Sequence, residues 1–287
     1  WRRTLASCHV RMGLAQLRRH SVAPAVTAFD SAIAILRGLL AEDPEDTETA
    51  LLAMDCLRMR TDAHRQMVEF QAALATSDEG TAIGERASAG KPGAIKLRRG
   101  LALVMLERGD VHIDLGEHQK ALDNYEPAMN IFRELAQKDP TNVKNRNSYA
   151  WSLVTIGNAR LQMGDTIEGW RGFARAGQVY EQLISEQPQD VRWKSNYGHV
   201  LDGFAEIHIA EGRLEEAMAV RQKQAAMYAA TTGLDPNLAQ VRMEIGSLHE
   251  QAGRHAEAVE VFTAALGGRR ELLAKDPTDT LRRSGVA

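Results

Sequence analysis

The sequence predicts an all-α fold, a solenoid of six helical hairpins in which each hairpin stacks on its neighbours. Aromatic residues make up only 5% of the 287 residues, although strands favour aromatic and β-branched side chains. Prolines recur at a period of 48 residues, and glycine, alanine and aromatic residues recur at fixed positions between them. An internal period of this length indicates a repeat architecture.

The prolines set the boundaries of the predicted repeats. Pro44, Pro92, Pro140, Pro188 and Pro236 are each 48 residues apart, and Pro277 follows after 41. Because the residue before a proline avoids helical backbone angles, each proline is expected to end the second helix of a hairpin. The predicted repeats cover 1–44, 45–92, 93–140, 141–188, 189–236 and 237–277, and a tail covers 278–287.

Four of the predicted hairpins turn at a glycine that lies 24 residues before the proline, because glycine adopts left-handed backbone angles without strain. The turn glycines are Gly116, Gly164, Gly212 and Gly253. A second glycine lies seven residues earlier, at 13, 109, 157 and 246, where a small residue lets two helices approach. An aromatic residue that fills the remaining space follows four of the turns, at Phe29, Tyr125, Phe173 and Phe262.

Three elements depart from this pattern. The second repeat is degenerate: Val68 replaces the turn glycine, and Gly80 and Gly84 weaken its second helix, so residues 80–93 are expected to form a loop. In the third repeat Pro127 is expected to kink the second helix by removing a hydrogen bond. The last repeat lacks seven residues, which leaves the face of its first helix unchanged because seven residues make about two turns.

The pattern of a small residue, a turn glycine, Ala, an aromatic residue, Ala and Pro resembles the tetratricopeptide repeat. The usual repeat has about 34 residues, so this chain resembles a longer bacterial variant found in arrays attached to signalling proteins such as serine/threonine kinases. The resemblance implies a right-handed superhelical solenoid with a concave groove lined by the first helix of each hairpin. It also implies a protein or peptide partner and no catalysis.

Composition narrows the functional classes. A formal net charge of -3 argues against nucleic-acid binding, and no continuous apolar run reaches the roughly 18 residues that suggest a membrane span. Two cysteines without a CxxC motif suit a cytoplasmic location. The chain begins at Trp1 rather than Met, so we expect it to be part of a longer protein.

No catalytic motif, cofactor site or metal site is predicted. The segment "GTAIGERASAGKPG" lacks the spacing of a phosphate-binding loop, since Lys91 is followed by proline. Four histidines share one repeat position, at 64, 112, 208 and 249. Neighbouring helices lie about 8–10 Å apart, too far for successive repeats to share a zinc ion with ligands at about 2 Å. We expect these histidines to be packed or half-buried polar rings.

Partner contacts are predicted on one face of the first helices. Acidic residues occupy one repeat position, and basic residues lie 14 positions upstream, near the same face because 14 residues come within about 40° of whole turns. An aromatic residue on this face would anchor a partner. The predicted contact residues are Asp62, Asp110, Asn158, Asp202, Glu206, Lys96, Lys144, Arg192, Trp151 and His199. The alternative is that these charges form a solvated surface.

The sequence therefore favours a non-catalytic protein-interaction scaffold, the docking or sensing part of a larger bacterial signalling protein. The alternative is a regulatory domain that binds a peptide or small ligand and controls an attached enzyme such as a serine/threonine kinase. Apolar ends without polar capping helices also favour a homodimer formed through the ends of the array.

Overall fold

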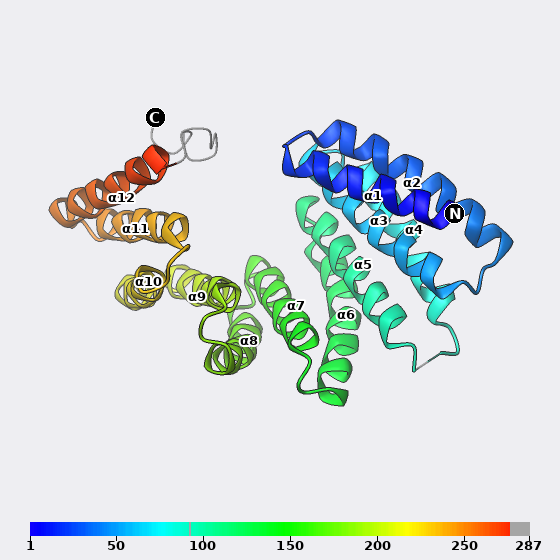
Figure 1. Ribbon diagram of the computed structural model, residues 1–287. Helices are drawn as coiled ribbons and strands as arrows, with labels where there is room; N and C mark the ends of the chain where they lie inside the picture. The colour runs from blue at the N-terminus through cyan, green and yellow to red at the C-terminus, as the bar shows by residue number, and fades with distance from the viewer. Residues whose placement is uncertain (92, 276–287) are drawn as a thin grey trace. The chain divides into compact units, whose positions relative to one another are not determined.

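The computed structural model describes residues 1–91 and 93–275, and within them every regular element is an α-helix. The helices are α1 Arg2–Arg18, α2 Val22–Glu42, α3 Thr47–Gln66, α4 Phe70–Ser88, α5 Ile95–Asp114, α6 His118–Lys138, α7 Val143–Gln162, α8 Thr166–Glu186, α9 Val191–Ala210, α10 Leu214–Ala229, α11 Asp235–Gln251 and α12 His255–Lys275 (Figure 1). The predicted all-α fold of consecutive helix-turn-helix units is confirmed.

The chain divides into two compact units, which are described separately. Unit 1 is Trp1–Ala159 and unit 2 begins at Arg160. In unit 1 each of α1 to α5 packs against the next helix along the chain, and α3 also packs against α5. In unit 2 the same sequential packing joins α8 to α12. Most contacts are therefore local, as in repeat proteins.

Each hairpin turns through one residue with left-handed backbone angles. The residue after it donates its backbone N–H to a carbonyl five residues earlier, at 2.8–2.9 Å, which closes the first helix. The predicted glycines occupy this position in four hairpins, with φ between 73° and 81°. The first two hairpins use His20 and Val68 instead, at φ 57° and 61°. The turn thus forms in all six hairpins, with backbone strain expected in two.

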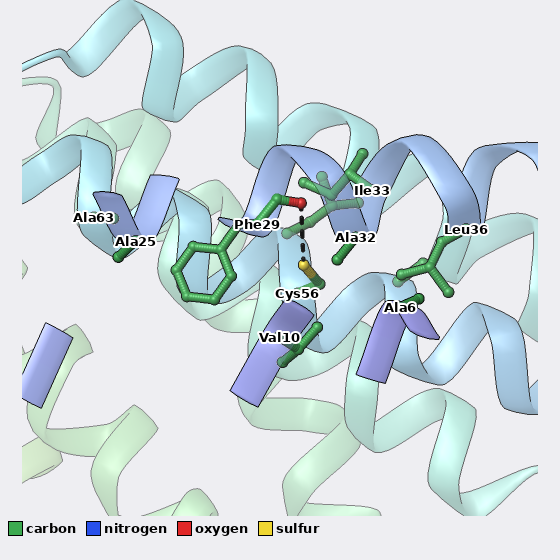
Figure 2. Close-up of a cluster of buried hydrophobic side chains, with 11 residues drawn as sticks. Ala6, Val10, Ala25, Phe29, Ala32, Ile33, Leu36, Cys56 and Ala63 are labelled. Atoms are coloured by element: carbon green, nitrogen blue, oxygen red, sulfur yellow. Dashed lines mark hydrogen bonds between the residues drawn. The ribbon is translucent and has the colours of Figure 1, made fainter. Parts of the chain in front are cut away.

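The recurring glycines on the first helices let an aromatic ring lie against the backbone. A Cβ added at Gly13 would lie 2.4 Å from Phe29 Cε1, and one at Gly109 would lie 2.2 Å from Tyr125 Cε1. Figure 2 shows Phe29 of α2 in the first core cluster, with Val10, Leu36 and Cys56 around it. Since Phe29 and Tyr125 are almost fully buried, these glycine–ring contacts position the helices of their hairpins.

The prediction of a loop at residues 80–93 is wrong for residues 80–88, which are helical. The helix α4 continues through Gly80 and Gly84 to Ser88. Gly84 occupies the repeat position of Leu36, Phe132 and Tyr180, and Met54 reaches from α3 into the space that a larger side chain would take. A Cβ at Gly84 would lie 2.8 Å from Met54 Sδ. Tertiary packing therefore outweighs the low helix propensity of glycine.

The prolines also act in two different ways. Pro44, Pro140 and Pro188 each follow the last residue of a second helix by two positions, as predicted. Pro236 does not end a helix, because α10 already ends at Ala229 and Pro236 lies in the first turn of α11, where proline is tolerated. Pro127 lies inside α6, which continues past it, so its kink stays a prediction. Pro92 and Pro277 are outside the described residues.

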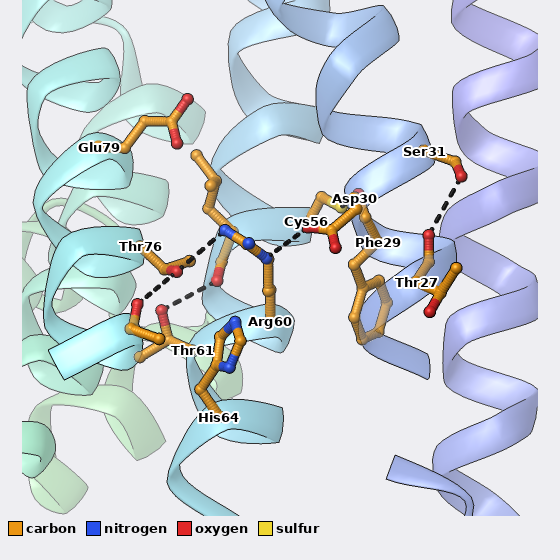
Figure 3. Close-up of polar contacts among 12 residues, drawn as sticks. Thr27, Phe29, Asp30, Ser31, Cys56, Arg60, Thr61, His64, Thr76 and Glu79 are labelled. Carbon is orange, nitrogen blue, oxygen red and sulfur yellow. Dashed lines mark hydrogen bonds and ion pairs between the residues drawn. The ribbon is translucent and has the colours of Figure 1, made fainter. Parts of the chain in front are cut away.

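Polar contacts join neighbouring hairpins of unit 1. From α3, Arg60 forms an ion pair with Asp30 of α2 at 2.8 Å and donates a hydrogen bond to Thr76 of α4 at 3.1 Å (Figure 3). From α5, 48 residues later, Arg108 pairs with Asp78 of α4 at 2.7 Å. Repetition of the contact makes the hairpins stack in one register.

One described helix, α2, is long and apolar enough to cross a membrane by length and composition alone. Its side chains Ala25, Phe29, Ile33 and Leu36 are buried against α1 and α3. Core packing therefore accounts for its apolar composition.

Candidate partner-binding surface

The predicted contact residues fall into both units, and in each unit some of them gather around one arginine. Asp110 belongs to the Arg65 cluster of unit 1, which consists of Arg65, Glu107, Asp110, Asp114 and Tyr125. Asp202 and Glu206 belong to the Arg221 cluster of unit 2, which consists of Arg221, Gln224, Asp202, Glu206 and Glu244.

The Arg65 cluster links α3 to α5 and α6. The carboxylates at 107, 110 and 114 lie on one face of α5, because residues three or four apart are neighbours on a helix. The Arg65 Nη1 atom lies 3.1 Å from Glu107 Oε1 and 3.3 Å from Asp110 Oδ2, and Arg65 Nε lies 2.6 Å from Asp114 Oδ2. The Tyr125 hydroxyl donates to Asp110 Oδ1 at 2.5 Å. Three carboxylates thus share one guanidinium.

The excess negative charge and partial burial of this cluster perturb its acids. Burial raises the pKa of Glu107 to about 7, with a further contribution from the charge of Asp110. Burial also raises the pKa of Asp110, although the hydrogen bond from Tyr125 opposes this. Burial and neighbouring negative charges disfavour the ionised form of such a carboxylate, and a further cation nearby would stabilise that form. The cluster therefore has the electrostatic character of a site for a positively charged group.

Arg221 occupies a repeat position where four of the other five hairpins have an aromatic residue. Arg221 stands in the repeat position of Tyr125 and Phe173, and Gln224 in that of Ala128 and Ala176. The Arg221 side chain is only 4% exposed. A buried arginine must be paired, because an unpaired buried charge is strongly destabilising. Carboxylates from two neighbouring helices supply that pairing.

The geometry of the Arg221 cluster satisfies most of its donors. The guanidinium contacts Asp202 of α9, Glu206 Oε1 at 3.2 Å and Glu244 Oε2 of α11 at 3.1 Å. Gln224 Nε2 donates to Asp202 Oδ1 at 2.8 Å and to the Gly198 carbonyl at 3.1 Å. Burial by itself raises the pKa of Asp202, but hydrogen bonds from His199, Gln224 and Arg221 and the charge of Arg221 lower it below its ordinary value. Asp202 is therefore held ionised.

The other predicted contact residues are less concentrated. Lys96, Lys144 and Asn158 are exposed, and Asp62 accepts a hydrogen bond from Gln66 at 2.9 Å. Trp151 is half-buried and packs against the core cluster around Phe132, so it is partly structural. Arg192 pairs with Asp190 and lies 5.0 Å from the Trp193 ring centre. His199 is exposed, and its Nδ1 lies 3.4 Å from Asp202 Oδ2.

The repeated histidines have a structural role at the hairpin turns. Their carbonyl groups accept the hydrogen bond that closes each turn. The His64 and His112 side chains are buried, and each Nδ1 lies 2.7 Å from a glutamate five residues later, Glu69 and Glu117. The expectation of packed polar rings is confirmed for His64, His112 and His208, which are all buried. No group of His, Cys, Asp or Glu in the described part of the chain is arranged to hold a metal ion.

Sequence reasoning missed the two arginines and most of their partners. Arg65 and Arg221 each stand in a mostly apolar repeat position: the next three repeats have Ile113, Leu161 and Ile209 where the second has Arg65. A charged residue in a mostly apolar column was the available signal. Glu107 and Glu244 also share one repeat position once the seven residues missing from the last repeat are taken into account.

Comparison with known proteins agrees with this architecture. Residues 239–267 match a family model described as tetratricopeptide repeat. The fold is that of a tetratricopeptide-like repeat protein. No curated protein matches the chain in sequence.

Several solved structures share the tetratricopeptide-like fold at low sequence identity. BtubC from P. vanneervenii has a TM-score of 0.68 and 14% identity, over 88% of this chain and 92% of its own. The nuclear import adaptor Nro1 of S. pombe has a TM-score of 0.59 and 13% identity, over 99% and 98%. A Rap protein complexed with Competence and Sporulation Factor has a TM-score of 0.58 and 13% identity, over 97% and 72%. These likenesses establish the fold.

Proposed function

We propose that the chain is a non-catalytic interaction scaffold whose first-helix faces bind a protein or peptide partner with positively charged side chains. The observation that carries this proposal is the pair of arginine clusters. In each cluster three carboxylates face one guanidinium, and some of them lie at the surface. A lysine or arginine of a partner would relieve the remaining repulsion.

The finer proposal is that this scaffold is the docking or sensing part of a larger bacterial signalling protein in the cytoplasm. It is supported by the resemblance of the repeats to those attached to signalling proteins, and by the fold shared with Nro1, an adaptor. The division into six repeats at the predicted prolines is part of the same proposal. So is a homodimer through the array ends, which sedimentation at several protein concentrations would test.

A second candidate is a regulatory domain that binds a peptide or small ligand and controls an attached enzyme such as a serine/threonine kinase. The likeness to a Rap protein complexed with Competence and Sporulation Factor favours this candidate. It differs from the first in requiring that ligand binding change an activity in the same protein.

The experiment compares partner capture by two variants with the same change in charge. Asp62→Lys with Glu206→Lys reverses charge on the predicted surface, whereas Glu85→Lys with Asp123→Lys reverses two exposed charges on second helices, α4 and α6. Circular dichroism first establishes that both remain helical. The proposal expects proteins captured by the wild type and control to be lost from the surface variant at low salt. Equal capture by all three proteins would refute it.

A further inference from the structure

Unit 1 contains a pocket that shares no residue with the Arg65 cluster. It has a volume of about 240 Å³ and opens between the second helices α2 and α4, above α3. Its apolar wall comes from aliphatic side chains of all three helices and from the loop after α2. These residues are Leu40, Ala41, Pro44, Ala50, Ala82, Ile83 and Ala87.

The pocket lies where the second hairpin lacks a side chain that other hairpins have. Ala87 occupies the repeat position of Leu135 in α6 and Leu183 in α8, and both of those leucines are fully buried. Met54 compensates for the nearby Gly84 by entering its space. Ala87 is buried against Leu97 and Leu101, and it also lines the aliphatic wall of the pocket, where a leucine would extend further.

The polar groups at the pocket are two arginines and one glutamate. Arg37 forms two hydrogen bonds with Glu79, Nε to Oε1 and Nη2 to Oε2, both at 2.6 Å. This bidentate pair uses the charge of Glu79 and fixes Arg37. Arg86 is exposed, and no hydrogen bond or ion pair engages its guanidinium among the described residues. The pocket therefore combines an aliphatic wall with one unpaired positive charge.

We propose that this pocket binds a carboxylate that bears a short branched aliphatic group, with Arg86 contacting the carboxylate and the alkyl group occupying the space beside Ala87. A guanidinium is suited to a carboxylate because its planar donors match the two oxygens. Pockets for drug-sized ligands start at roughly 300 Å³, so this smaller one suits a molecule of amino-acid size. This site is independent of the scaffold function proposed above.

The chemistry fits both a free branched acid and the C-terminal leucine of a peptide. The test therefore uses two probes, 4-methylpentanoate and the tetrapeptide Gly-Gly-Gly-Leu, each compared with its uncharged amide. Binding to the full chain is followed by titration with nuclear magnetic resonance detection of methyl groups lining the pocket. If both acids bind, a free branched acid is enough to occupy the pocket. If only the peptide binds, the pocket is specific for the C-terminal leucine of a peptide.

Three variants test the assigned roles. Ala87→Leu restores the side chain of the other hairpins and is expected to abolish binding by filling the pocket. Arg86→Gln removes the charge and is expected to weaken acid binding about tenfold or more without changing the amides. Arg175→Gln, an exposed arginine of α8, is the control and should bind like the wild type.

Several outcomes would overturn the assignment. They are equal binding of the acids and their amides, unchanged binding in Arg86→Gln, or no binding of either acid by the wild type. If Ala87→Leu does not fold, Arg86→Gln alone decides, because its side chain is at the surface and packs in no core cluster. Unchanged binding in a folded Ala87→Leu would place the ligand elsewhere.

Discussion

Val68 provides the sharpest test of how local backbone angles stabilise this array. It occupies the left-handed position of the turn between α3 and α4, at φ 61°, where the four later turns have glycine at φ between 73° and 81°. For an L-residue these angles cost roughly 1–2 kcal/mol, and a β-branched side chain is especially unfavourable there. The Val68→Gly variant is expected to remove this strain.

The expected gain follows from two opposing quantities. Relief of the left-handed strain favours the variant, whereas the larger conformational freedom of glycine in the unfolded chain opposes it by about 0.4–1 kcal/mol. Little apolar burial is lost, because Val68 is 69% exposed. The net expectation is a stabilisation of about 1 kcal/mol, which corresponds to roughly a fivefold change in an equilibrium constant.

The assay is native-state hydrogen exchange of the amides in α3 and α4, because repeat arrays need not unfold in one step. Their protection should rise about fivefold in Val68→Gly. The matched control is Val259→Gly in α12, where valine has a similar exposure of 66% in a regular helix and glycine should destabilise by about 0.5–1 kcal/mol. Unchanged or reduced protection of α3 and α4 in Val68→Gly would refute the reasoning.

Three further predictions concern the packing and charge of each unit. Gly109→Ala should destabilise α5 and α6 by about 1–3 kcal/mol, because its Cβ would lie 2.2 Å from Tyr125 Cε1; a urea midpoint equal to the wild type would contradict this. Arg221→Met should lower the stability of unit 2 by about 1–3 kcal/mol, because three neighbouring, partly exposed carboxylates lose their shared cation, and adding Asp202→Asn should recover part of the loss in thermal unfolding. Burial raises the pKa of Glu107 from 4.5 to about 7 in the folded state. Between these pH values the folded state binds a proton that the unfolded state has lost, so the free energy of unfolding should fall as pH rises from about 4.5 to 7. Glu107→Gln should flatten this fall, by up to about 3 kcal/mol, and an identical pH profile of the urea midpoint in both proteins would disprove the assignment.

The candidate site could be predicted only in part. Asp110 and Glu206 were predicted as contact residues from their shared repeat position, and Asp202 as a contact residue of the same face; the structure brings all three into clusters. Their arginines were not predicted, because Arg65 contacts carboxylates 42 to 49 residues away in the chain. Trp151 was expected on the binding face, but it packs partly against a core cluster. Helical periodicity alone gives the face of a side chain, and not whether a neighbouring helix covers it.

The sequence by itself determined the class of fold and the order of its hairpins. Gly116 allows the left-handed backbone angles of its turn, and Pro140 disfavours helical angles at the residue before it. The same residues recur along the chain, so the same local preferences recur in most repeats. Only the tertiary structure shows how the core is packed where a repeat lacks the expected residue. Met54 occupies the space beside Gly84 within the helical α4, while Ala87 is packed in the core and also lines the pocket. Helix ends depend on a few neighbouring residues, whereas core volume and charge pairing depend on side chains brought together from different helices.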